Sequence, residues 1–228
     1  GLVLGNDGQH FSAGANLAMI LMLSIEQDWD DLEFVVRQFQ NTMMRIRYSG
    51  IPVVAAPHGM ALGGGCETCL HSDQIVASAE TYIGLVEVGV GVIPAGGGTK
   101  EMALRASDTY MKDLVELPEL QKRFLTIGQA SVATSAYEAY DLGLMRKGLD
   151  SITINPHRVI ADAKRAVINL ADKGYTQPIQ RTDIKVMGKS ALSSLYIGVN
   201  SFKLAGYISD HDQKIADKLA YVICGGDL

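Results

Sequence analysis

The chain has 228 residues, of which 47% are hydrophobic and 20% are charged, enough apolar material for one globular domain with its own core. Its formal net charge is −5 and it has no Lys/Arg cluster, which argues against a nucleic-acid partner. The apolar stretch at residues 17–23 is too short to cross a bilayer. We therefore expect no membrane partner and a cytoplasmic location, with which the three cysteines agree.

The first part of the chain predicts a strand end, a loop of small residues and two helices. Residues 1–4 end a strand, and residues 5–8 are turn formers. Small residues surround Gly14 and lead into an apolar helix. A second helix starts after Asp28, and its apolar face follows helical spacing at Val35, Phe39, Met43 and Ile46. The arginines on its other sides are expected to be solvated, namely Arg37, Arg45 and Arg47.

The centre of the chain predicts a buried strand followed by a glycine-rich turn. Residues 52–56 have the length and β-branched content of such a strand. Three glycines at residues 63–65 precede a helix that carries Glu67 and runs to about His71. Glycines let a ligand approach backbone N–H groups at the positive end of the helix dipole, where an anionic oxygen is stabilised. A plain tight turn is the alternative that three glycines alone leave open.

Two cysteines in this helix form a C-x-x-C pattern. Cys66 and Cys69 would need further ligands to hold a metal, but the chain has no second C-x-x-C and Cys224 is far away. We interpret both cysteines as small buried helix residues. His71 is interpreted as a polar cap at the helix end rather than as a catalytic group, and no metal site is expected.

A single carboxylate stands in the long apolar, glycine-rich stretch that follows. Residues 73–77 predict a strand, and residues 82–84 a short extended piece. Glu87 comes next, with no basic residue between positions 82 and 99. A carboxylate in such surroundings is paired, exposed in a loop, or functional with a raised pKa. The lack of a nearby basic residue argues against a local ion pair. Residues 96–98 are glycines and open a helix expected at residues 99–106.

The remainder of the chain predicts mainly helices. From Ser107 the pattern is mixed and helical with a break at Pro118, and Ser135 and Glu138 have the spacing of a capping box. Residues 151–154 predict a strand, and a helix then begins at Pro156 and ends near residue 174. After a linker at residues 176–180, the segment 181–228 is expected to be helical, most clearly at residues 210–224.

The alternation of strands and helices predicts an α/β fold with ligand sites at the glycine-rich turns. The residues 11–17 (FSAGANL), 61–67 (ALGGGCE), Glu87 and 93–99 (IPAGGGT) together resemble the crotonase (enoyl-CoA hydratase/isomerase) superfamily in order and spacing. The resemblance implies a crotonase-like ββα superhelix over residues 1–174, truncated at its N-terminus. Residues 175–228 resemble the C-terminal helices of bacterial crotonase domains fused to a 3-hydroxyacyl-CoA dehydrogenase, and are expected to pack on the core.

The resemblance also implies roles for individual residues. The oxyanion hole for a thioester carbonyl falls on the N–H groups of Ala15 and Gly64. Glu67 and Glu87 match the two glutamates that flank the water of hydratases, and the first-turn position suits Glu67 as base while apolar surroundings suit Glu87 as acid. Further substrate contacts are expected at Ala13, Gly14, Gly63 and Pro94. Asn16 departs from the family, which commonly has Asp there.

The implied activity is hydration of a 2-enoyl-CoA in fatty-acid β-oxidation. Two alternatives stay open, an isomerase that moves a 3-enoyl double bond to position 2 and a non-catalytic acyl-CoA-binding module. We expect an acyl-CoA substrate, a homo-oligomer, and no cofactor in this chain. No glycine run spells a G-x-G-x-x-G after a first strand, so NAD would belong to an absent dehydrogenase part.

Overall fold

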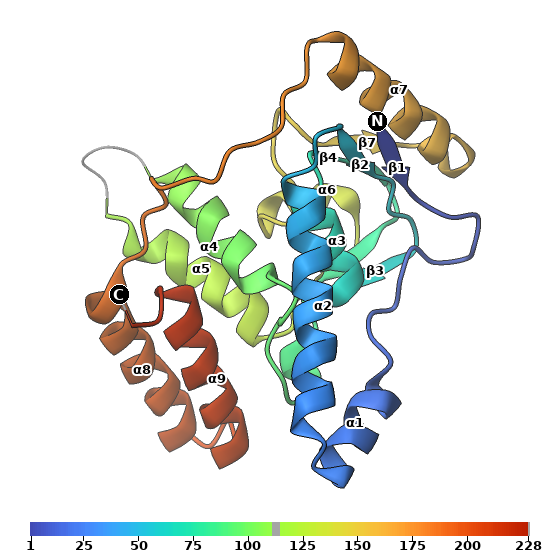
Figure 1. The fold of residues 1–228 in the computed structure, drawn as a ribbon. Helices are drawn as coiled ribbons and strands as arrows, with labels where there is room; N and C mark the ends of the chain where they lie inside the picture. The colour runs from blue at the N-terminus through green and yellow to red at the C-terminus, as the bar shows by residue number, and fades with distance from the viewer. Residues whose placement is uncertain (111–114, 228) are drawn as a thin grey trace.

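The structure, a computed structural model, describes residues 1–110 and 115–227. Figure 1 shows strands at the centre with helices around them. The helices are α1 (Leu17–Glu26), α2 (Trp29–Arg47), α3 (Gly64–His71), α4 (Gly98–Thr109), α5 (Leu117–Gly128), α6 (Ala136–Asp141), α7 (Val159–Asp172), α8 (Gly188–Leu204) and α9 (Asp210–Ile223), with 3₁₀ helices at Glu87–Val90 and Pro156–Arg158. The strands are β1 (Leu2–Leu4), β2 (Val53–Ala55), β3 (Met60–Leu62), β4 (Gln74–Ser78), β5 (Tyr82–Gly84), β6 (Val132–Ala133) and β7 (Ser151–Thr153).

Two small sheets form the centre of the fold. The first has the order β1-β2-β4-β7 with every pair parallel, and the second has the order β3-β5-β6 with β3 and β5 parallel. A parallel sheet is normally covered on both faces, so its strands are apolar on both sides. This explains why β2 is a continuous apolar run rather than an alternating one.

Successive residues of β2 point into two different clusters of buried side chains. Val54 packs with Val159 and Val167 of α7, whereas Ala55 belongs to the main core with residues of α3 and α4. The period of two in a strand produces this division. The loop after β2 therefore emerges from a strand that is packed on both faces, and it leads into β3, which the glycine run follows.

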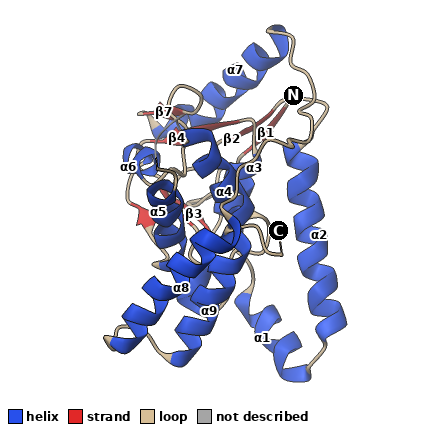
Figure 2. Ribbon diagram, turned by 90° about the vertical axis from the view of Figure 1, so that its left-hand side faces the viewer, coloured by secondary structure: helices blue, strands red, loops and turns tan. Residues whose placement is uncertain are grey.

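The C-terminal helices contribute to the same main core. Leu195 of α8 and Leu219 of α9 are buried in one cluster with Phe124 of α5 and Met102 of α4. Figures 1 and 2 show α8 and α9 lying together beside α4 and α5. Ser209 begins α9 with a complete capping box to Asp212, which fixes the start of the helix expected at residues 210–224.

Several local expectations need correction. Pro118 does not break a helix but lies in the first turn of α5, where the missing N–H has no intrahelical partner to lose. Ser135 does cap α6, but the Glu138 carboxylate accepts from the N–H and hydroxyl of Thr134 instead of completing a capping box. Residues 111–114, within the stretch expected to be helical, and Leu228 lie outside the described residues.

One of the arginines expected to be solvated is not. The side chain of Arg47 is only 16% exposed and forms an ion pair with Glu101, which is fully buried. Arg37, by contrast, pairs with Glu33 on the surface. Arg47 lies at the last turn of α2, where the helix meets α4, so its environment depends on a helix more than fifty positions away in the chain.

Candidate active site

The two loops of small residues come together at the end of β3. Ser12 forms an isolated parallel bridge with Ala61, and the N–H of Leu62 donates to the Ser12 carbonyl at 2.9 Å. Gly14 has a φ of +97°, and a Cβ placed on it would lie 3.3 Å from the Leu62 carbonyl and 3.9 Å from the Gly64 nitrogen. A glycine is required here because the two backbones approach closely.

The predicted oxyanion residues lie on either side of this contact. Gly64 is the first residue of α3, so its N–H has no acceptor within the helix. Ala13 and Ala15 flank Gly14 on the exposed loop facing it. Gly63 adopts a φ of +54° at the helix start. The structure therefore brings Gly14, Gly63 and Gly64 together, with Ala15 adjacent in the chain.

Asn16 shows how the loop enters α1. Its side-chain oxygen accepts from the N–H groups of Ala18 and Met19, at 3.1 and 3.4 Å, so it is the N-cap of α1. An amide makes these hydrogen bonds as a carboxylate would. The departure from the Asp common in the family therefore removes a charge but keeps the cap.

Glu67 is held in the first half of α3 and is 2% exposed. Its Oε1 accepts from the N–H of Gly98 at 2.8 Å. Burial raises the pKa of this carboxyl, and hydrogen bonds from the N–H groups of Gly96, Gly97 and Gly98 oppose the rise without cancelling it. The expectation that the helix terminus lowers this pKa is therefore wrong in direction, because loss of water outweighs the donors.

Glu87 is the first residue of a 3₁₀ helix and lies against the same glycine loop. A Cβ on Gly63 would lie 3.3 Å from Glu87 Oε1. Its Oε2 is buried and accepts no hydrogen bond from the described residues. Burial, and then the charge of Glu67, raise the pKa of Glu87 to about 7, as the apolar surroundings predict. The carboxylate of Glu67 is therefore near enough to act on the ionisation of Glu87.

Pro94 is buried just before the loop that holds Glu67, and its carbonyl accepts from the Thr99 hydroxyl at 3.5 Å. It fixes the start of the 95–98 turn. All the site residues named from the sequence thus fall in three segments, at residues 12–16, 62–67 and 87–98, of which the second includes the first turn of α3 and the third begins with a 3₁₀ helix.

Sequence reasoning did not find a buried charged cluster behind Glu67. Glu101, in the first turn of α4, pairs with Arg47 and with Lys100 at 2.8 Å, and its Oε1 lies 3.7 Å from His71 Nε2. His71 is buried at the end of α3, and its Nδ1 donates to the Glu67 carbonyl at 2.7 Å. Burial is the main cause that lowers the pKa of His71 to about 4. His71 is thus a neutral buried group that supports the backbone of Glu67.

The remaining sequence-based expectations about this helix concern its thiols. Cys66 and Cys69 are free and fully buried, which confirms them as small core residues. No group of three His, Cys, Asp or Glu that could hold a metal occurs among residues 1–110 and 115–227. Within the same ranges, no helix is both long and apolar enough to cross a membrane.

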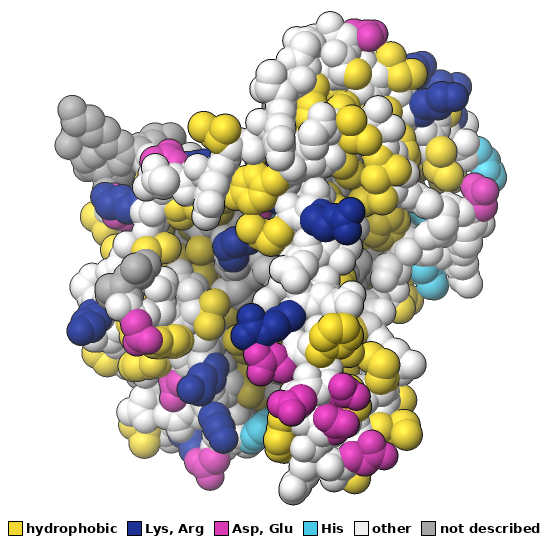
Figure 3. Space-filling model, viewed as in Figure 1, with side chains coloured by type: hydrophobic (Ala, Val, Ile, Leu, Met, Phe, Trp, Pro, Cys, Tyr) yellow, Lys and Arg dark blue, Asp and Glu magenta, His cyan; other side chains and the backbone are white. Residues whose placement is uncertain are grey.

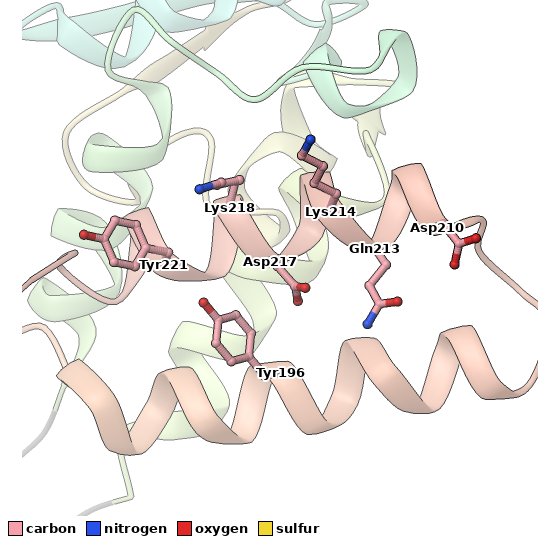
Figure 4. Close-up of a pocket in the computed structure, with 7 residues that line it drawn as sticks. All are labelled: Tyr196, Asp210, Gln213, Lys214, Asp217, Lys218 and Tyr221. Atoms are coloured by element: carbon pink, nitrogen blue, oxygen red, sulfur yellow. The ribbon is translucent and has the colours of Figure 1, made fainter.

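Other hollows lie away from the glutamates. Figure 4 shows a groove between α8 and α9 in which Gln213 and Asp217 point toward α8 while Lys214 and Lys218 point away. Its lining carries both signs of charge and includes none of the site residues named from the sequence. In Figure 3 acidic side chains gather over the lower end of α2, where its first turn carries Asp30 and Asp31. Neither feature adjoins the two loops described above.

Comparison with known proteins identifies related sequences and structures. The enoyl-CoA hydratase/isomerase family matches residues 1–114. A Bacillus subtilis protein named "Probable 3-hydroxyacyl-CoA dehydrogenase" is 46% identical over 226 residues, which is 99% of this chain and 28% of that protein. Crotonyl-CoA hydratase of Syntrophomonas wolfei is 27% identical over 177 residues, covering 76% of this chain and 58% of that protein. The chain thus spans less than two thirds of the length of either relative.

A solved structure extends the comparison to the fold. An enoyl-CoA hydratase from Bacillus anthracis matches with a TM-score of 0.58 and 24% identity, over 97% of this chain and 72% of that one. The expected α/β crotonase-like fold is confirmed.

Proposed function

The chain belongs to the enoyl-CoA hydratase/isomerase family, and we propose that it adds water across the 2,3 double bond of a 2-enoyl-CoA. The observation that carries the proposal is the pair Glu67 and Glu87. The Glu87 carboxylate lies against Gly63 at the start of α3, the Glu67 carboxylate lies against the glycines at residues 96–98, and both groups have a raised pKa. Two interacting carboxylates next to free backbone N–H groups are suited to acid/base chemistry on a carbonyl compound.

The thioester oxygen is proposed to lie between the N–H groups of Ala15 and Gly64. Negative charge develops on this oxygen when the α-carbon becomes an enolate, and preorganised donors stabilise it. Gly64 suits this role because its N–H is unused within α3. Ala13, Gly14, Gly63 and Pro94 would line the same cleft, where small side chains leave room for the substrate backbone.

Proton movements then follow from the two carboxyl groups. Glu67, ionised and held by N–H donors, takes a proton from a water molecule while the oxygen of that water bonds to the β-carbon. Glu87, protonated, supplies a proton to the α-carbon, so the product gains one water in total. The buried, unpartnered Oε2 of Glu87 suits a carboxyl that keeps its proton near neutral pH. These steps use only side chains and backbone groups of this chain, and we propose no cofactor for them.

Two alternatives differ in what they need from the pair. An isomerase that shifts a 3-enoyl to a 2-enoyl double bond needs one carboxylate to move a proton between carbons, so one glutamate would be dispensable. A non-catalytic acyl-CoA-binding module needs neither. The burial of two carboxylates, each displaced in pKa, favours hydration because binding alone gives no reason for that cost.

The wider context is also a proposal. The name of the Bacillus subtilis relative supports a place in β-oxidation beside a 3-hydroxyacyl-CoA dehydrogenase part, which would use NAD and consume the 3-hydroxyacyl product. A homo-oligomer is supported by α1, which has no buried residue and exposes Leu21, Met22 and Ile25, next to an exposed Trp29. An apolar surface of this kind is commonly covered by another chain.

The decisive test is the pair of variants Glu67→Gln and Glu87→Gln. Glutamine keeps the shape of the side chain and removes its proton chemistry, so each variant should hydrate a 2-enoyl-CoA ~10²-fold or more slowly, with CoA-ester binding near normal. Glu80→Gln is the matched control, because Glu80 is exposed in a turn. Hydration within a few-fold of wild type in both variants would remove the proposal. A double-bond shift that survives in Glu87→Gln alone would favour the isomerase.

A further inference from the structure

Helix α2 lies against both loops of the candidate site. Figure 1 shows α2 running alongside α3. The half-buried ring of Phe39 contacts the two glycine turns at once. A Cβ placed on Gly64 would lie 3.1 Å from its Cζ, and a Cβ placed on Gly96 would clash with its Cε1. One side chain of α2 therefore touches the start of α3 and the loop that holds Glu67.

The neighbouring residue of α2 makes a directed contact with the same loop. Gln40 Nε2 donates to the Ala95 carbonyl at 2.7 Å. A second contact with α2 holds the other end of the loop. The N–H of Glu101 donates to the Gly97 carbonyl at 2.9 Å, and the carboxylate of Glu101 pairs with Arg47 at the end of α2. Two points of α2 thus fix the two ends of the 95–98 turn.

This turn needs such restraint because of its composition. Gly96, Gly97 and Gly98 follow one another, and glycine has more backbone freedom than any other residue. The N–H of Gly98 donates to Glu67, and those of Gly96 and Gly97 also act on its pKa. If the turn changes its direction, these donors no longer point at the carboxylate.

We propose that Gln40 is a positioning residue for Glu67, acting through the Ala95 carbonyl and the three N–H groups that follow it. Phe39 supports the same turn by packing. The functional part of this proposal rests on the proposed hydration, but the contact itself does not. Gln40 touches no reacting atom, so its loss should lower kcat through misplacement of Glu67 while leaving the affinity for the CoA ester almost unchanged.

The donor character of the side chain distinguishes this role from simple packing. Gln40→Leu removes the donor, and Gln40→Glu replaces it by a carboxylate, which only accepts and is repelled by a carbonyl oxygen. Gln40→Lys keeps a donor with comparable reach. Gln38 provides the matched control on the same helix, since it is exposed and its side chain makes no hydrogen bond within the described ranges.

The experiment measures kcat and KM for hydration in the full chain, together with hydrogen exchange of the amides at residues 95–98. We expect Gln40→Leu and Gln40→Glu to lower kcat about 5- to 10-fold with KM changed less than about twofold, and to speed amide exchange in this segment. Gln40→Lys should recover most of kcat and of the protection. Gln38→Leu should behave as wild type.

The outcomes separate the two proposals. Unchanged exchange at residues 95–98 in Gln40→Leu, or an equal loss of kcat in Gln40→Lys, would overturn the positioning role. A wild-type chain that hydrates no 2-enoyl-CoA would instead remove the proposed function. In that case the exchange comparison still decides whether Gln40 holds the turn.

Discussion

The carboxylate of Glu67 accepts a hydrogen bond from the N–H of Gly98, at 2.8 Å between Oε1 and nitrogen, although the two residues are 31 positions apart. Burial raises the pKa of this carboxyl, and the N–H groups of residues 96–98 lower it. Glu87 lacks such support on Oε2 and has the charge of Glu67 as a further cause that raises its pKa. The N–H groups of the 96–98 turn oppose the rise in the pKa of Glu67 and give no such support to Glu87, so the two carboxyl groups differ in acidity.

The raised pKa of Glu87 should make stability depend on pH. The group binds its proton more tightly in the folded chain, with a pKa of about 7 against its ordinary value of 4.5. Its contribution is therefore full below pH 4.5 and is lost as pH rises through 7, by at most about 3 kcal/mol.

The measurement is the free energy of unfolding between pH 5 and 8 in wild type and Glu87→Gln. His71, whose pKa is lowered to about 4, acts in the opposite direction, but it is present in both proteins and cancels in the difference. Wild type should lose stability relative to the variant as pH rises. Parallel curves would contradict the burial of Glu87 as an acid.

The contact between the two small-residue loops should not tolerate a methyl group at Gly65. A Cβ there would lie 2.6 Å from the Ser12 Cβ, in an ordinary backbone conformation. Gly65→Ala should push the Ser12 loop, and with it Ala15, away from Gly64. We expect a loss of about 1–3 kcal/mol of stability and a hydration rate lower by ~10-fold or more.

Gly198→Ala in α8 is the control for that substitution. A Cβ at Gly198 meets nothing within 4 Å, so alanine should stabilise the helix by about 0.5–1 kcal/mol. Chemical denaturation of both variants gives the comparison. If Gly65→Ala matched Gly198→Ala in stability and kept full hydration, the loops would not be in the close contact described.

Removing one partner of the buried ion pair between Arg47 and Glu101 should strongly destabilise the protein. Arg47→Met leaves a fully buried carboxylate with Lys100 and neutral His71 only, and should cost about 3 kcal/mol or more. Arg37→Met, on the same helix, breaks a pair whose side chains are 71% and 60% exposed and should cost less than about 1 kcal/mol. The double variant Arg47→Met/Glu101→Leu should recover part of the loss. Equal effects at Arg37 and Arg47 in urea unfolding would contradict this account.

We propose that residues 175–228 form an extension of the core rather than an independent domain. Leu219 of α9 is fully buried, and Leu219→Ala should cost about 2–5 kcal/mol while the chain keeps a single unfolding transition. Leu204→Ala, at a side chain that is 81% exposed, should change stability by less than about 0.5 kcal/mol. A separate transition that alone responds to Leu219→Ala would argue for a second domain.

Local patterns predicted most elements, because strands and helices depend on neighbouring residues. The bounds of β5 and the start of α9 agree with the sequence, and so does the raised pKa of Glu87. The solvation of Arg47 and the pKa of Glu67 could not be predicted in this way. Arg47 pairs with Glu101, which is far away in the chain, and the pKa of Glu67 is raised by burial, which outweighs the donors of the 96–98 turn. Sequence spacing does not reveal which distant segments bury either group.

The two buried thiols of α3 allow local unfolding of this helix to be measured by chemical modification. Thiol reagents react with the thiolate, and burial raises the pKa of Cys66 and of Cys69 well above the ordinary range. Cys66 directly precedes Glu67 and Cys69 follows it by two positions, so an alkylating reagent can modify them only after this part of α3 has been exposed to water. The rate of modification at high reagent concentration would therefore report how often α3 detaches from the core.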